Sequence, residues 1–221
     1  MGIGERVRYR NGDGISDIQP DWGPDTTKPE ITLTTPAEGA TYTLNESVTA
    51  DYECADEGGS GLKSCEGDVA DGALIDTGSV GSKTFAVTAT DNGGNTSSVS
   101  HTYSVIYDFN GFLSPVDNPP TLNLVKAGSV IPVNFSLSGD QGLDVFADGY
   151  PTPQKIACDT GVSADPVEET LSANESSLTY DASSDQYTYA WKTNKAWAGN
   201  CRQLVVKLKD GTEHLANFEF K

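Results

Sequence analysis

Residues 85–105 are Phe-Ala-Val-Thr-Ala-Thr-Asp-Asn-Gly-Gly-Asn-Thr-Ser-Ser-Val-Ser-His-Thr-Tyr-Ser-Val. Phe85, Val87 and Ala89 alternate with threonine and alanine, and the same period of two returns over residues 99–105. Such alternation indicates a strand with one buried face. The Asp-Asn-Gly-Gly-Asn segment between the two runs is typical of a turn. The stretch therefore predicts two consecutive strands joined by a turn.

The alternation continues toward the N-terminus. Ile31 and Leu33 alternate with threonines, and residues 48–54 show apolar and polar side chains in turn. Residues 36–39 and 56–61 are rich in Gly, Pro, Asp and Ser, which terminate strands. Short strands with turns at this spacing predict a β-sandwich. No stretch shows helical periodicity, so we expect an all-β fold.

The first half of the chain resembles a known domain family. Residues 31–42, the 54–65 segment with its Gly-Ser-Gly at 59–61, and residues 85–96 are similar to bacterial immunoglobulin-like domains of the secreted, tandem-repeat kind. The resemblance covers residues 28–107 and implies an immunoglobulin-like sandwich. It implies nothing about a ligand.

The second half also shows strand patterns. Residues 130–137, 187–191 and 204–208 are rich in β-branched and aromatic side chains. Lys209-Asp-Gly-Thr212 predicts a hairpin, because Asp-Gly supplies the positive φ that tight hairpins need. Residues 217–220 then complete the sheet. We therefore expect two consecutive sandwich domains.

Residues 108–221 resemble the PxKF domain, a family of secreted bacterial C-terminal modules. The matching stretches are Phe112–Pro120, Lys126–Ser129, Gly139–Leu143, Trp191–Thr193, Trp197–Gly199 and Cys201–Leu204. The motif that names the family is Pro132-Val-Asn-Phe135 here, with Asn134 at the position of the family's lysine. The resemblance implies no catalytic activity.

Residues 1–27 do not show the pattern of a domain, and we expect a linker or the remnant of a preceding domain. Asp17-Ile-Gln-Pro-Asp-Trp22 resembles the tail of a Tol-type β-propeller repeat. This resemblance implies that the chain is the C-terminal part of a larger secreted protein. The first eight residues contain no apolar run, so a signal peptide is not expected within this segment.

The four cysteines form two local pairs in the sequence, Cys54 with Cys65 and Cys158 with Cys201. Four cysteines allow three pairings, and proximity selects this one if each pair lies within its own domain. Zinc is the alternative, but no CxxC motif occurs and the histidines lie far from the cysteines in sequence. Two disulfides are therefore favoured, and they place the protein outside the cell.

Charge excludes several functions. The chain carries 14 Lys and Arg against 32 Asp and Glu, a formal net charge of −18. Such a chain repels phosphate backbones, so nucleic acid is not an expected partner. No apolar run is long enough to span a bilayer, so membrane insertion is not expected. We expect a secreted or surface-attached monomer.

Asn11, Asp13 and Asp17 lie in a glycine-containing loop and form a candidate calcium site. Tyr9 and Pro20 occupy positions where calcium ligands are expected, so a plain turn is favoured and no cofactor is required. Residues 91–95 are also acidic and glycine-rich. There too a turn that joins two strands is the favoured interpretation.

Aromatic side chains of the second domain suggest a carbohydrate site. Tyr187, Tyr189 and Trp191 share one strand face, and Trp197 follows in a loop. Flat rings stack on the apolar faces of sugars, so polysaccharide or cell wall is a candidate partner. The alternative is that the strand residues form the sandwich core.

Catalysis is not expected. His101 and His214 lie in no recognisable catalytic motif. Asn134, on an apolar strand, is a candidate acceptor for an internal isopeptide bond, but no lysine partner is identified. The sequence thus predicts a non-catalytic extracellular accessory or stalk module. The alternative is a carbohydrate- or cell-wall-binding module that acts through Trp197, Tyr189 and Trp191.

Overall fold

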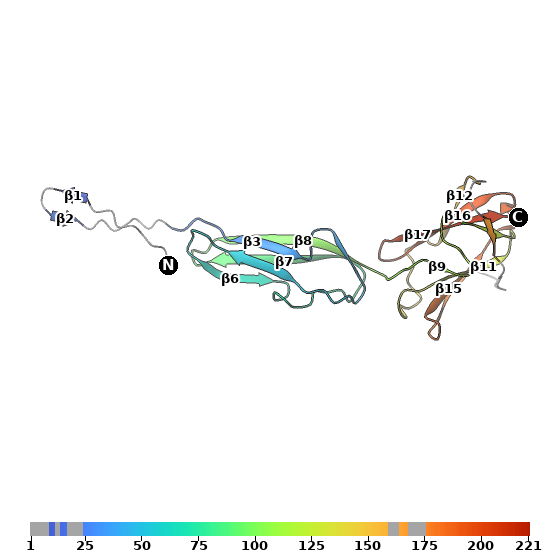
Figure 1. Ribbon diagram of the computed structural model, residues 1–221, viewed down its shortest axis with the longest axis horizontal. Coiled ribbons are helices and arrows are strands. Elements are labelled where there is room, and N and C mark those ends of the chain that lie inside the picture. Colours follow the sequence, from blue (N-terminus) through green and yellow to red (C-terminus); the bar gives the residue numbers. More distant parts are fainter. Residues whose placement is uncertain (1–8, 12–13, 17–23, 159–163, 168–175) are drawn as a thin grey trace. The chain divides into compact units, whose positions relative to one another are not determined.

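The structure is a computed structural model of the chain (Figure 1). It describes residues 9–11, 14–16, 24–158, 164–167 and 176–221. These residues form strands and turns, together with one short 3-10 helix, η1 (Lys195–Trp197). The predicted all-β fold is therefore confirmed. Within the described ranges, no helix has the length and apolar character needed to cross a membrane.

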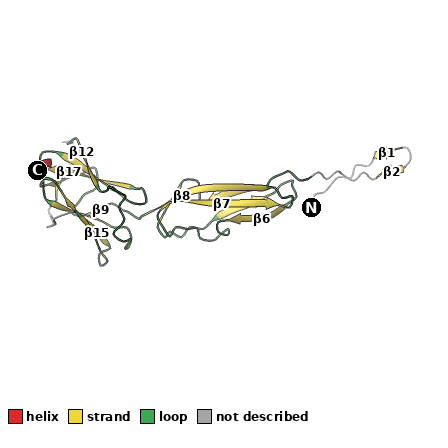
Figure 2. Cartoon of the chain, turned by 180° about the vertical axis from the view of Figure 1, so that it is seen from behind, coloured by secondary structure: helices red, strands yellow, loops and turns green. Residues whose placement is uncertain are grey.

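The chain divides into two compact units, and strands dominate both of them (Figure 2). Unit 1 comprises Met1–Gly78 and Ser82–Ser104, and unit 2 comprises Ser79–Gly81 and Val105–Lys221. Ahead of the sandwich of unit 1, two short strands form an antiparallel hairpin, β1 (Tyr9–Asn11) with β2 (Gly14–Ser16).

Unit 1 is a sandwich of two sheets. Its strands are β3 (Glu30–Thr35), β4 (Ala40–Thr43), β5 (Asp51–Ala55), β6 (Leu62–Gly67), β7 (Gly81–Asp91) and β8 (Thr96–Ile106). One sheet has the order β4-β8-β7-β6, and the other pairs β3 with β5. The alternation over residues 85–105 therefore corresponds to β7 and β8. Its apolar positions Phe85, Val87 and Ala89 are at most 2% exposed.

A disulfide joins the two sheets of unit 1. Cys54 on β5 is bonded to Cys65 on β6, with 5.9 Å between their Cα atoms. Tyr52 of β5 contacts Phe85 of β7, with ring centroids 6.1 Å apart. This apolar contact and the disulfide hold the two sheets together, and the pairing of Cys54 with Cys65 predicted from the sequence is confirmed.

Unit 2 is a second sandwich. Its strands are β9 (Phe112–Leu113), β10 (Leu122–Val125), β11 (Val130–Phe135), β12 (Thr152–Ile156), β13 (Ala164–Pro166), β14 (Ser177–Asp181), β15 (Gln186–Lys192), β16 (Cys201–Lys207) and β17 (Glu213–Phe220). The sheets have the orders β12-β16-β17-β10-β13 and β14-β15-β11-β9. Strand β10 pairs in parallel with both β13 and β17.

The core of unit 2 is rich in aromatic side chains. Trp191 of β15 and Phe218 of β17 meet between the sheets with ring centroids 4.9 Å apart. Phe135 of β11 stacks on Tyr187 of β15 at 5.3 Å, and both residues are fully buried. The predicted disulfide Cys158–Cys201 is also present, so both cysteine pairings are confirmed.

Candidate metal centre

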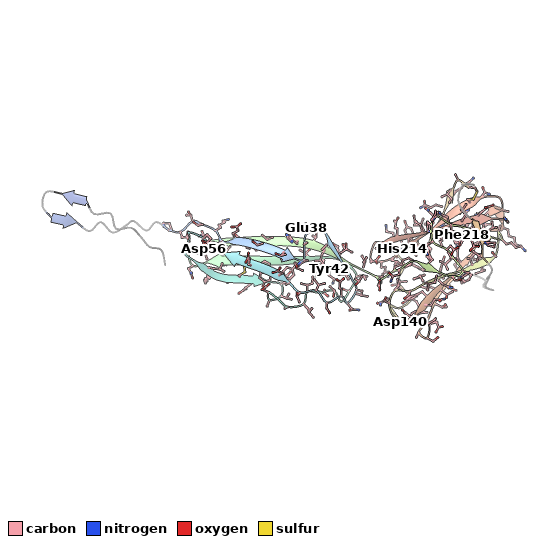
Figure 3. The ribbon with its side chains drawn as sticks, viewed as in Figure 1. Glu38, Tyr42, Asp56, Asp140, His214 and Phe218 are labelled. Atoms are coloured by element: carbon pink, nitrogen blue, oxygen red, sulfur yellow. A yellow bond between two sulfur atoms is a disulfide. The ribbon has the colours of Figure 1, made fainter. Side chains whose placement is uncertain are left out.

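Three carboxylates meet at one end of unit 1. Asp25 precedes β3, Asp56 directly follows β5, and Asp91 is the last residue of β7. Antiparallel pairing brings the start of β3 and the end of β5 to the same end of the sandwich. Figure 3 shows Asp56 at this end and Glu38 and Tyr42 toward the other. We call Asp25, Asp56 and Asp91 the aspartate cluster.

The members of the aspartate cluster are close enough to share one cation. One oxygen from each carboxylate lies within 4.8 Å of the others. Asp91 is fully buried, and Asp25 and Asp56 are half-buried. The ion pairs of the described residues are made by other carboxylates, such as Asp76 with Lys83. The three carboxylates of the cluster therefore lie together in a partly buried site.

Hydrogen bonds fix two of the three carboxylates in place. The Asp25 oxygens accept bonds from the backbone N–H of Thr27 at 2.9 Å and of Ser60 at 2.6 Å. A hydrogen bond from the Ser60 side chain, followed by the one from the Thr27 backbone, lowers the pKa of Asp25 from its ordinary value. Asp91 accepts from the backbone of Asn95 at 2.8 Å and from its side-chain amide at 2.7 Å.

Asn95 also connects the cluster to the segment that leads into β3. Its Nδ2 donates to the carbonyl oxygens of Asp25 and Thr27, both at 3.0 Å. A hydrogen bond also connects the turn after β7 to the loop after β5, because the backbone N–H of Gly93 donates to Ser60 Oγ at 2.7 Å. Three segments that are distant in sequence thus converge on the aspartate cluster.

Asp56 differs from its two partners. Its Oδ2 accepts from the backbone N–H of Gly61 at 2.7 Å, but its Oδ1 is closed to solvent and has no hydrogen-bond partner. A buried oxygen without a donor is costly and rare. Gly59 packs directly against one side of this carboxylate, because a Cβ added there would lie 2.5 Å from both Asp56 oxygens.

The earlier calcium candidates are placed differently. Asp13 and Asp17 lie outside the described residues, and Asn11 is described only as backbone at the end of β1. The predicted turn at residues 91–95 is present between β7 and β8. Its first residue, Asp91, also joins the aspartate cluster, which the sequence pattern did not predict. Period-two patterns indicate where strands begin and end but not which ends meet. The signal in the sequence was therefore limited to an acidic residue near each of three strand boundaries.

The aromatic candidates of unit 2 are mostly covered. Trp191 is 3% exposed and belongs to the core, so its faces are not open to a sugar. Tyr189 is half-buried against Phe146, at a centroid distance of 5.5 Å. Trp197 is half-buried too, and the guanidinium of Arg202 lies over its ring at 4.3 Å.

The two histidines act as local hydrogen-bonding groups. His101 Nδ1 lies 2.8 Å from the carbonyl oxygen of Pro36. His214 stacks on Phe109 at 3.6 Å, and its Nε2 lies 2.9 Å from Thr212 Oγ1. Burial lowers the pKa of His214, and Asp210 opposes this effect.

The histidine of unit 2 lacks the geometry of a catalytic triad. The carboxylate of Asp210 accepts from Thr212 Oγ1 at 2.7 Å, whereas a triad carboxylate orients the imidazole itself. The Asn134 amide is engaged at both ends as well. It donates to the carbonyl oxygen of Ser114 at 2.7 Å and accepts from Thr188 at 2.9 Å.

Comparison with known proteins finds matches only among solved structures, and those described below have TM-scores below 0.5. No protein-family model matches the chain, and no curated protein matches it. Solved structures do match. A chimeric titin Z1Z2 carrying an exogenous decorin peptide is 10% identical at a TM-score of 0.26, over 86% of this chain and 96% of that one.

Two further matches are a protocadherin extracellular domain and a protein of a mixed-linkage glucan utilization locus. The protocadherin GammaB4 extracellular domain is 16% identical at a TM-score of 0.28, over 87% of this chain and 32% of that one. A Bacteroides ovatus SGBP-B in complex with a mixed-linkage heptasaccharide is 11% identical at a TM-score of 0.25, over 88% of this chain and 47% of that one. The chain thus spans less than half the length of either. These scores carry no argument about function.

Proposed function

We propose that the chain is a non-catalytic extracellular accessory module of a secreted or surface-attached bacterial protein. Unit 1 is then a bacterial immunoglobulin-like domain and unit 2 a PxKF-like domain, as their sequence resemblances imply. One disulfide within each unit supports an oxidising compartment. The net charge of −18 favours a monomer that stays soluble.

One observation carries this proposal: the large aromatic side chains of unit 2 serve its core. Tyr187 is fully buried and Trp191 is 3% exposed. Trp197 packs edge-on against Phe220, with 5.3 Å between the ring centroids. The guanidinium carbon of Arg202 lies over the Trp197 ring, 4.3 Å from its centroid. Rings used in this way stabilise a module and are not free to form a binding platform.

The histidines also favour a non-catalytic role. A hydrolase of the triad type needs a nucleophile, a base and a carboxylate that orients the base. Thr212 lies beside His214, but Asp210 binds the threonine and not the imidazole. We therefore expect no hydrolytic turnover by this group.

Carbohydrate or cell-wall binding is the second candidate function. It is supported by Tyr189 and Trp197, which are half-buried and keep part of their surface exposed. Binding would require Arg202 to move off the ring of Trp197, since the guanidinium now lies over it.

A retention assay separates the two candidates. The purified chain is incubated with insoluble polysaccharides and bacterial cell walls, and the bound fraction is measured over a range of protein concentrations. We expect no saturable retention. Hydrolysis of the same polymers is measured in parallel, and turnover above that of a buffer blank would contradict the non-catalytic assignment.

If one polymer retains the chain, variants identify the surface. Trp197→Ala should abolish retention at a temperature where the variant is still folded, while Tyr150→Ala, at another half-buried aromatic of unit 2, should leave retention unchanged. This outcome would replace the accessory role by a targeting role. If the native chain binds no polymer and Trp197→Ala is less stable, Trp197 has a structural role only.

A further inference from the structure

We propose that the aspartate cluster of unit 1 binds one Ca²⁺ ion. The proposal rests first on geometry: oxygens of Asp25, Asp56 and Asp91 lie within 4.8 Å of one another, a separation that one cation between them can bridge. They come from three different segments, so the site forms only in the folded unit. It differs from the loop at residues 11–17, which supplies none of these groups.

A second observation points to a missing ligand. Asp56 Oδ1 is closed to solvent and accepts no hydrogen bond, although every other oxygen of the cluster has a donor. A buried charged oxygen is normally hydrogen-bonded, paired or bound to a metal, so a cation shared with Asp25 and Asp91 would satisfy it. Asp91 also favours a bound cation, because its carboxylate is fully buried beside two further carboxylates.

The donor set selects the metal. All three side chains offer carboxylate oxygens, which suit the hard ions Ca²⁺ and Mg²⁺, and no cysteine or histidine belongs to the cluster. Ca²⁺ accepts irregular arrangements of six to eight oxygens, while Mg²⁺ demands a near-ideal octahedron. Carboxylates on three independent loops, each already holding backbone donors, fit the more tolerant ion.

The bound ion would fasten the segment before β3 to the rest of unit 1. Asp25 lies on that segment, which is held by hydrogen bonds that involve Asn95, Ser60 and Thr27. An ion shared by Asp25, Asp56 and Asp91 adds a bond to each of the two loops that the segment crosses. Calcium would thereby order residues 24–29 as well as stabilise the sandwich.

Calorimetric titration tests the site. The full chain is freed of metal with a chelator and titrated with CaCl₂ to roughly 10 mM, above the millimolar range of extracellular calcium modules. We expect one saturable site, a melting temperature of unit 1 that rises with calcium, and at least about tenfold weaker binding of MgCl₂.

Single substitutions assign the site to residues. Asp25→Asn, Asp56→Asn and Asp91→Asn each remove one charged ligand and should weaken calcium binding by about tenfold or more. Glu57→Gln is the matched control, because it removes the same charge from the exposed neighbour of Asp56. Asp25→Asn guards against misfolding, since Asp25 is only half-buried and its variant should still unfold in one cooperative transition without calcium, at a somewhat lower temperature.

The outcomes are distinct. Equal loss of binding in Glu57→Gln would show diffuse attraction of cations to an acidic chain and would overturn the site. The absence of saturable binding by the native chain to roughly 10 mM would overturn it as well. Binding that survives in a folded Asp25→Asn would remove Asp25 from the site and with it the role of fastening the segment.

Discussion

Unit 1 and unit 2 share a sandwich architecture but are held together by different means. In unit 2, Phe135, Tyr187 and Phe218 are fully buried, and ring contacts run through the core. Unit 1 buries fewer rings, among them Tyr52, Phe85 and Tyr103, and side-chain hydrogen bonds around the aspartate cluster organise one of its ends. Sandwiches of the same general architecture can thus depend mainly on apolar packing or, at one end, on polar contacts between loops.

The largest expected effect comes from the core of unit 2. Phe218→Ala should lower the free energy of unfolding of unit 2 by about 3–5 kcal/mol, because it leaves a cavity where a ring was fully buried. Denaturant titration followed by tryptophan fluorescence measures this loss, since Trp191 and Trp197 lie in unit 2. Leu143→Ala, at a side chain 58% exposed, is the control and should change little. A loss below about 1 kcal/mol in Phe218→Ala would contradict the packing account.

Removal of the disulfides should give the next largest effect, and the loss of stability should be larger in unit 2 than in unit 1. Cys158 and Cys201 are 43 residues apart, and Cys54 and Cys65 are 11 apart. Replacing each pair by serine should cost about 4 kcal/mol in unit 2 and about 3 kcal/mol in unit 1, because the longer loop gains more chain entropy when opened. Thermal unfolding of the two double variants measures both losses. A larger loss in unit 1 would show that its short bridge between sheets does more than restrict the unfolded chain.

Acid should act on unit 2 through His214. Burial lowers the pKa of His214, so its imidazole binds a proton more readily in the unfolded chain than in the folded one. Stability is then complete above the ordinary histidine pKa of about 6.5 and decreases as pH falls below it, by less than the one-proton limit of about 1.4 kcal/mol per pH unit. Chemical denaturation of unit 2 between about pH 7 and 5 measures the slope. His214→Gln should reduce it, and an unchanged slope would assign the effect to other groups.

Unit 1 should respond to acid in a different range. Hydrogen bonds from Ser60 and Thr27 lower the pKa of Asp25, so its stabilising effect is present above the ordinary aspartate pKa and is lost as pH falls through the lowered value. We expect the melting temperature of unit 1 to fall only below about pH 4. Asp25→Asn should flatten this part of the profile. A fall that begins near pH 6 would point to a different group.

The smallest effect is expected at an exposed ion pair of unit 2. Lys207 Nζ lies 2.9 Å from Glu213 Oε1, and the side chains are 34% and 48% exposed. Exposed pairs contribute little, so Glu213→Gln should shift the melting temperature by less than about 2 °C. Differential scanning calorimetry at low and high salt measures the shift. A larger change would mean that unit 2 depends on surface charge more than its apolar core indicates.

Much of the architecture was predictable because it is encoded locally. The period of two over residues 85–105 places Val87 and Ala89 in the core, where both are fully buried. The spacing of Cys54 and Cys65 likewise predicted a bridge within one domain, and the structure confirms it.

The aspartate cluster was not predictable in the same way. Asp25, Asp56 and Asp91 meet because the segment before β3 runs past the ends of β5 and β7, and neither the spacing of these residues nor their sequence neighbours predict this meeting. The surroundings of Trp197 were equally hidden. They depend on Arg202, which belongs to the next strand and lies over the ring. Local patterns predict elements, whereas sites built from several loops depend on how the elements are assembled.

The parallel pairing of β10 with β17 has a consequence for biogenesis. Leu122–Val125 lies beside Asn217–Phe220, so a central position of the sheet stays empty until residues more than 90 positions later have been synthesised or exported. Contacts of such long range form slowly. Unit 1 contains its whole sandwich before residue 107 and is able to fold as it emerges. Unit 2 must wait for its last strand, and during that interval the apolar edge of β10 needs protection from other chains.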